Sequence, residues 1–233
     1  MKIKLWMPRL WAIALAIILS LTISNLPVVA FVSNTQTLNL EHLKLTNECN
    51  GCDLTNVDFT AIDDNNFDLY GSSLIEADLS GANLTGMLMQ QATLTGAKLI
   101  NTNLSQVRAR DADFKTADFS QANLTGADLS NTVLNEANLS STTLTKADFS
   151  AAELENAKLV DDSAENVNFY DATLFSVDLS GANLANSDLK EANLIGAVLT
   201  KTNLCGASLS RARMPDYKIY SGNVTKYGAI DCE

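Results

Sequence analysis

Apolar residues recur at every fifth position from Leu54 to Ile219 except at Asp64, with no insertion or deletion. Of the 34 positions in this series, 28 are Leu or Phe. Small side chains precede them by two residues, and Ala occupies 18 of these 34 places. We call the Leu or Phe position central, the earlier one small, and the residue between them, usually Asp or Asn, the outer position. The motif is A(D/N)LxX, as in 77–81 and 122–126.

A period of five matches neither regular element. A helix repeats its face every 3.6 residues and a strand every second residue, so neither could keep all the central residues on one face. A chain that turns a corner in each unit and coils over itself would point the central and small side chains inward. The pattern therefore predicts a solenoid with an apolar interior and a polar surface.

This motif extends over about 70% of the chain, which resembles the pentapeptide-repeat family. The resemblance implies an all-β fold, a right-handed quadrilateral β-helix in which four units close one coil. With coils about 4.8 Å apart, the 34 units predict about 8 coils between terminal caps. The expected domains are a signal peptide at 1–30, an N-terminal cap at 31–53, the β-helix at 54–214 and a C-terminal cap at 215–233.

The N-terminal segment has the pattern of a secretory signal peptide. A basic segment with Lys2, Lys4 and Arg9 precedes a mostly apolar run at 10–23. A small-residue cleavage site follows at 28–30. An uncleaved membrane anchor is the alternative, because residues 10–32 could just span a bilayer. Cleavage would change the net charge from −11 to −14, since three basic residues and no acidic residue would leave.

The four cysteines lie near the two ends of the repeat. In the frame of the repeat, Cys49 occupies a central position and Cys52 a small one, so both should point inward. We expect a buried structural pair, reduced or bonded, rather than a metal or redox site, because there is no second CxxC and the only histidine is His42. A Cys205–Cys232 disulfide would hold the tail over the last coil, and export favours it.

Two segments disturb the repeat. Asp64 occupies a central position, and we expect a bulge that turns it outward while Phe67 fills the space. At 161–166, Asp162 and Ala164 occupy the two inward positions. A solvated bulge is favoured at both segments over a bound divalent cation.

A third departure is the pair Arg108 and Arg110, which flank Ala109 in a central position that Ala underfills. The arginines could form ion pairs with acidic neighbours one coil away, such as Asp128. The alternative is a point of contact with a partner, because surface ion pairs contribute little stability.

The outer positions differ from side to side when they are read every twentieth residue. One side is almost uncharged, and we expect its side chains to form a hydrogen-bonded ladder between coils. Its outer positions include Asn83, Asn103, Asn123, Thr143, Ser163, Asn183 and Asn203. The five asparagines are candidates for an interaction face, together with Arg108 and Arg110, while the other three sides carry most of the acidic residues.

No constellation of catalytic residues stands out, since the single histidine precedes the repeat and no glycine-rich phosphate loop is present. We therefore expect no enzyme activity, no cofactor and no metal. The favoured function is an exported structural or interaction module that presents a rigid acidic rod to an unknown protein partner. The resemblance to exported cyanobacterial-type members implies the thylakoid lumen or the periplasm.

Two other functions are alternatives. The quinolone-resistance members of the family are DNA mimics that bind gyrase, and an acidic rod fits that electrostatic logic; the signal peptide argues against a cytosolic target. A thiol redox protein would use Cys49 and Cys52, although their inward orientation makes them poor nucleophiles. We expect no nucleic-acid partner and membrane contact only through an uncleaved signal segment. Homo-oligomers remain compatible with the sequence.

Overall fold

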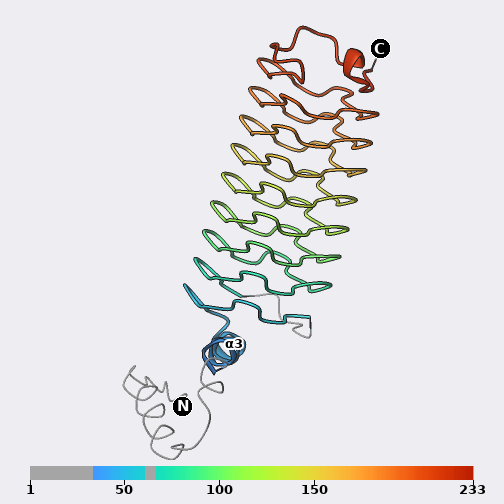
Figure 1. The fold of residues 1–233 in the computed structure, drawn as a ribbon. Coiled ribbons are helices and arrows are strands. Elements are labelled where there is room, and N and C mark those ends of the chain that lie inside the picture. The colour runs from blue at the N-terminus through green and yellow to red at the C-terminus, as the bar shows by residue number, and fades with distance from the viewer. Residues whose placement is uncertain (1–33, 61–66, 233) are drawn as a thin grey trace, which may run out of the picture. The chain divides into compact units, whose positions relative to one another are not determined.

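The computed structural model describes residues 34–60 and 67–232. Helix α3 (Asn34–Thr46) precedes a stack of coils, and the short 3-10 helix η1 (Thr225–Tyr227) lies near the C-terminus (Figure 1). The coils belong to one compact unit, Gln36–Glu233. The predictions for the signal peptide and for Asp64 lie outside the described residues. Neither helix in the described part is long and apolar enough to cross a bilayer.

The coils are joined by parallel backbone bridges between residues twenty apart. The bridges run from Glu48↔Asp68 to Asn193↔Arg213, and each involves the outer position of a unit. The all-β prediction needs one correction: in the described residues these are isolated bridges rather than extended strands, because a corner follows almost at once. A register of twenty residues corresponds to four units per coil, whereas the handedness and the number of coils stay predictions.

Each unit ends in a tight turn. In most described units the backbone N–H of the small residue donates to the carbonyl of the preceding central residue, as from Ala77 to Leu74 at 3.0 Å. The N–H of Val167 donates to the Oγ of Ser187 instead, at 3.1 Å. The residue just before the small position, which we call the corner position, has a positive φ at every described unit from Gly51 to Arg211. A type II turn requires this conformation at its third residue. Most corner residues are nonetheless not glycine, as Ala151 illustrates with φ 55°.

Substituting Ala151 with glycine should therefore stabilise the coil. A left-handed conformation costs an L-residue about 1–2 kcal/mol, and the extra entropy of glycine in the unfolded chain offsets about 0.5–1 kcal/mol of that gain. The free energy of unfolding in urea should rise by about 0.5–1 kcal/mol in Ala151→Gly. Gly86→Ala is the matched reverse change, because its added Cβ would meet nothing within 4 Å, and it should lower stability by a similar amount. An unchanged free energy in both variants would contradict strain at the corners.

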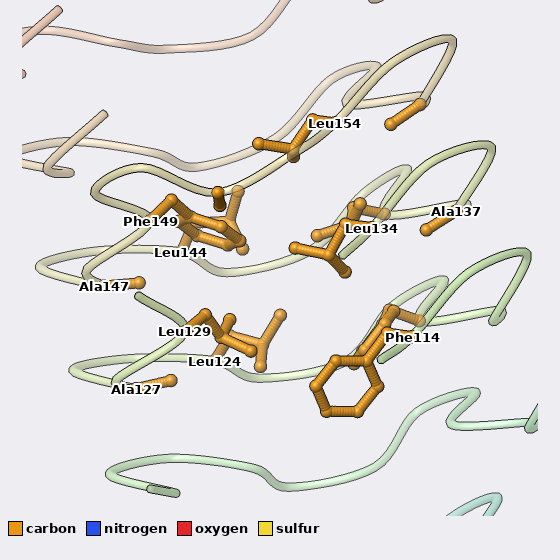
Figure 2. Close-up of a cluster of buried hydrophobic side chains, with 14 of the residues drawn as sticks. Phe114, Leu124, Ala127, Leu129, Leu134, Ala137, Leu144, Ala147, Phe149 and Leu154 are labelled. Atoms are coloured by element: carbon orange, nitrogen blue, oxygen red, sulfur yellow. The ribbon is translucent and has the colours of Figure 1, made fainter. Parts of the chain in front are cut away.

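The core lies inside the coils. Figure 2 shows Leu124, Leu134 and Phe149 pointing inward from the coil walls, with Ala137 and Ala147 packed close to the backbone. All five side chains are at most 1% exposed. The central and small positions thus do what the five-residue pattern predicts, because alternating large and small side chains fill the narrow interior at close packing.

Helix α3 covers the first coil. Leu43 is fully buried against the core, and the side-chain amide of Asn39 donates to the backbone carbonyl of Asp53 at 2.8 Å. The helix ends where the N–H of Asn47, at φ 59°, returns to the Leu43 carbonyl. The first bridge between coils joins Glu48 to Asp68, and the boundary between cap and coil after residue 53 stays a prediction.

The chain folds back over the last coil at its C-terminal end. Arg213 pairs antiparallel with Ile219, and the N–H of Tyr220 donates to the carbonyl of Ala212 at 2.9 Å. Further on, Ile230 pairs parallel with Asn203, in the place that another coil would occupy. The segment 215–232 therefore satisfies part of the free backbone edge that a solenoid leaves at its end.

The prediction of a solvated bulge at 161–166 is wrong. The bridges Thr143↔Ser163 and Ser163↔Asn183 continue through this segment, and the Asp162 side chain is only 2% exposed. The backbone N–H of Thr142 donates to its Oδ1 at 2.7 Å. Burial raises the pKa of Asp162 to about 8, and the nearby Asp161 charge adds to the rise. The coil register is kept because the acid can be buried in its neutral form.

Candidate interaction surfaces

Asp and Asn at the outer positions serve the turn that follows them. The Oδ1 atom of Asn123 accepts the backbone N–H of Thr125 at 3.0 Å, and Asp178 accepts that of Ser180 in the same way at 3.0 Å. Such local bonds are the reason that these residues favour turns. Much of the acidity on the surface therefore has a structural role, so an outer Asp is not by itself a functional residue.

Hydrogen bonds from the residue two places after an outer Asp also lower the pKa of several of these carboxyl groups. Hydrogen bonds from the hydroxyl and the N–H of Thr55 lower the pKa of Asp53. Ser80 lowers the pKa of Asp78 in the same way, with a further contribution from Lys98. These carboxylates remain ionised at neutral pH, and the sides that carry them present fixed negative charge to solvent.

The side that carries Asn83, Asn103, Asn123, Asn183 and Asn203, which we call the amide side, forms the expected ladder in two runs. The Nδ2 of Asn103 donates to the Oδ1 of Asn83 at 3.3 Å, and Asn123 donates to Asn103 at 3.4 Å. Asn203 donates to Asn183 at 2.9 Å. Thr143 and Ser163 separate the runs because their side chains are too short to continue an amide ladder. All five asparagines are half-buried or exposed.

Other sides contain similar rungs that were not expected from the sequence. Asn138 donates to Asp118 at 3.0 Å, and Asn168 donates to Asp148 at 2.9 Å. The sequence contained a signal for these bonds, because Asn138 and Asn168 each follow an outer Asp by twenty residues. A ladder is therefore no special property of the amide side. What distinguishes that side is that its units at 82–86, 102–106, 122–126 and 142–145 contain no charged residue.

The side that carries Arg108 and Arg110 departs from the expected ion pairing. Both arginines are exposed, and the Nε of Arg110 donates to the Oγ of Ser130 at 3.0 Å. Within residues 34–60 and 67–232, no ion pair joins Arg108 to Asp128, so that expectation is wrong. The Oδ1 of Asp128 instead accepts the Ser130 hydroxyl at 2.6 Å and its N–H at 3.2 Å. The turn in the Asp128 unit competes with the arginine for this carboxylate.

The four cysteines form two disulfides, one near each end of the coils. Cys49 and Cys52 are joined with Cα atoms 5.3 Å apart, and Cys49 is 2% exposed. Cys205 and Cys232 are joined with Cα atoms 4.8 Å apart. In the described part of the chain, no group of three or more His, Cys, Asp or Glu side chains is arranged to hold a metal ion.

The model of the family described as pentapeptide repeats matches most of the chain, in eight copies. The matched segments are 52–87, 88–126, 122–159, 163–190 and 187–215. No curated protein matches the chain.

Several solved structures are similar to this chain. HetL, a pentapeptide repeat protein involved in heterocyst differentiation regulation from the cyanobacterium Nostoc, is 32% identical over 74% of this chain and 87% of its own, with a TM-score of 0.40. QnrB1, a plasmid-mediated fluoroquinolone resistance protein, is 18% identical over 71% of this chain and 82% of its own, with a TM-score of 0.38. A pentapeptide repeat protein from the Arabidopsis thaliana thylakoid lumen is 27% identical over 57% of this chain and 68% of its own, with a TM-score of 0.17.

The segments that the family model matches lie within the repeat seen in the sequence. The matched segments cover more than half of the chain, and each contains the central Leu or Phe and the small residue that point into the core. The resemblance inferred from the motif is thereby confirmed, and this chain belongs to the pentapeptide repeat family.

Proposed function

We propose that this protein is an exported, non-enzymatic interaction module that presents its acidic coils to a protein partner. The observation that carries the proposal is the contrast between sides on one backbone-bonded stack. The amide side has no charged residue in its four units between Asn83 and Thr145. A second side has carboxylates at its outer positions Asp58, Asp78, Asp118 and Asp178. Because every coil is hydrogen-bonded to the next, the outer side chains are held at fixed spacing, which lowers the entropy cost of binding.

Export is supported by two independent features. The pattern at 1–30 is typical of a signal peptide. The Cys49–Cys52 and Cys205–Cys232 disulfides fit an oxidising compartment. We propose the thylakoid lumen or the periplasm as the site of action.

The two alternatives receive less support. A thiol redox protein needs an accessible sulfur, but Cys49 is 2% exposed and Cys52 is partly buried against the core. A DNA mimic needs negative charge on the sides that face its target. The amide side has no charged residue in the four coils that carry Asn83, Asn103, Asn123 and Thr143, and Arg108 and Arg110 interrupt a second side. Export would also separate the protein from a cytosolic target.

Capture from the native compartment tests the proposal. The exported protein serves as bait, beside Asn103→Lys with Asn123→Lys on the amide side. We expect the native bait to retain a specific protein through washes at moderate salt. Loss of that protein in the variant would place the contact on the amide side, and retention would place it on a different side. A native bait that captures no protein above a bead control would contradict the proposal.

A further inference from the structure

Three exposed or half-buried side chains lie beside the two arginines, and we call the five residues the arginine patch: Tyr70, Leu88, Gln90, Arg108 and Arg110. The outer positions are joined in register by the bridges Asp68↔Leu88, Leu88↔Arg108 and Arg108↔Asp128. Tyr70, Gln90 and Arg110 follow these outer residues by two places and project from the same side. Successive coils are about 4.8 Å apart, so the patch is one continuous surface.

The fold does not explain these residues. Leu88 and Arg108 occupy outer positions, and neither side chain can accept the turn N–H that Asn123 or Asp128 accepts in other units. Ala109, between Arg108 and Arg110 in the sequence, underfills its central position in the core, where it is fully buried. Three neighbouring departures from the repeat therefore forgo local stabilisation, and residues of this kind are commonly found at functional sites.

The two guanidinium groups are available to a ligand. Neither Arg108 nor Arg110 takes part in an ion pair with another of the described residues, and the single bond of Arg110 to Ser130 uses only its Nε. Arginine N–H groups are arranged to bind a carboxylate through two parallel bonds. Tyr70, 44% exposed, is held by its hydroxyl bond to the Oε1 of Gln91 at 2.7 Å and offers an apolar ring face. Arginine and tyrosine are enriched where protein interfaces carry most of their energy.

We propose that the arginine patch binds a short acidic segment of a partner protein, with carboxylates on Arg108 and Arg110 and an apolar side chain over Leu88 and Tyr70. The inference rests on the proposed function and names the chemistry of its partner. The charges around the patch exclude a long polyanion: Asp68 and Asp128 flank it along the stack, and the whole chain carries −11. The negative charge of the ligand must therefore be confined to one or two groups.

Fluorescence anisotropy tests this proposal with a labelled short peptide in which two glutamates alternate with two leucines. The native protein should bind the peptide, and the variant Arg108→Asn with Arg110→Ser should bind it at least about tenfold more weakly. This variant installs the residues that the repeat uses elsewhere, so it should unfold at the same or a higher urea concentration. The matched control is Lys98→Asn with Lys158→Asn, which makes the same change in net charge at outer positions of another side and should bind like the native protein.

Four outcomes would overturn the proposal. The first two concern the ligand: the native protein does not bind the glutamate–leucine peptide, or it binds a glutamine–leucine peptide equally well. The third is an equal loss of binding in the Lys98 and Lys158 control. The fourth is displacement of the labelled peptide by a single-stranded oligonucleotide at a lower concentration than by the unlabelled peptide. The capture experiment separates these failures from the general proposal. If the patch fails but native bait and patch variant capture the same protein, the interaction module stands and its contact lies elsewhere.

Discussion

The free energy of unfolding should fall by about 5 kcal/mol as the pH rises from about 4 to 8, because Asp162 is buried as a neutral acid. Its pKa is about 8 in the folded protein, against an ordinary value near 4. Between these values the unfolded chain has released the proton and the folded chain retains it. Stability therefore decreases with rising pH in this window and levels off above pH 8, at about 1.36 kcal/mol for each unit of the pKa difference.

Asp162→Ala should remove this dependence. Alanine is the usual residue at the small position, so the variant should be about 4 kcal/mol more stable than the native protein at pH 7 and similar to it at pH 4. Asp162→Asn gives a second comparison, because its Oδ1 can still accept the N–H of Thr142. Urea unfolding followed by circular dichroism at several pH values measures both. An equal slope in the native protein and in Asp162→Ala would show that other groups cause it.

Asp216 contributes in a different pH range and with the opposite sign. Its bond from the Tyr227 hydroxyl, at 2.7 Å, and the nearby Lys226 hold its pKa at about 2. A lowered pKa favours folding above the ordinary value near 4 and loses that contribution as the pH falls towards 2. The slope between pH 4 and 8 therefore belongs to Asp162.

The sequence predicted the interior of the coil because one rule operates in every unit. Leu134 and Phe149 are buried for the same reason, since a five-residue repeat can bury its large residues only by turning inward. The same rule held at Asp162, which is 2% exposed, although the chemistry of that residue had suggested a solvated bulge. Turning that side chain out would break backbone bonds such as the one from the Asn183 N–H to the Asp162 carbonyl, at 2.8 Å. The register of the stack prevailed over the preference of the single residue.

The surface was less predictable than the core. The sequence correctly indicated which side chains are neighbours between coils, as Asn103 and Asn123 show. It could not indicate which of several partners a side chain selects, and so Asp128 bonds with Ser130 instead of Arg108. The left-handed corners were also hidden, because residues such as Ala151 carry no signal for a positive φ and adopt it only because the turn bond demands it.

Removing the Cys205–Cys232 disulfide should release the C-terminal tail without unfolding the central coils. The bond closes a loop with a sequence separation of 27 residues, for which chain entropy gives a stabilisation of about 3.5 kcal/mol. In Cys205→Ser with Cys232→Ser, the amides of Lys201 and Leu204 should exchange with solvent more than about a hundredfold faster. They donate to the carbonyls of Gly228 and Ile230 at 2.7 and 2.9 Å.

The amide of Leu134, which donates to the Glu153 carbonyl at 2.6 Å in the middle of the stack, should keep its exchange rate. Coils contact only their neighbours, so a loss at one end reaches the centre weakly. The matched control replaces Cys49 and Cys52 by serine at the opposite end and should leave Lys201 and Leu204 protected. If these two amides exchange no faster without the C-terminal disulfide, the backbone bonds of the tail are sufficient to hold it. The tail then closes the stack as one more side of the coil, and the disulfide is dispensable for that contact.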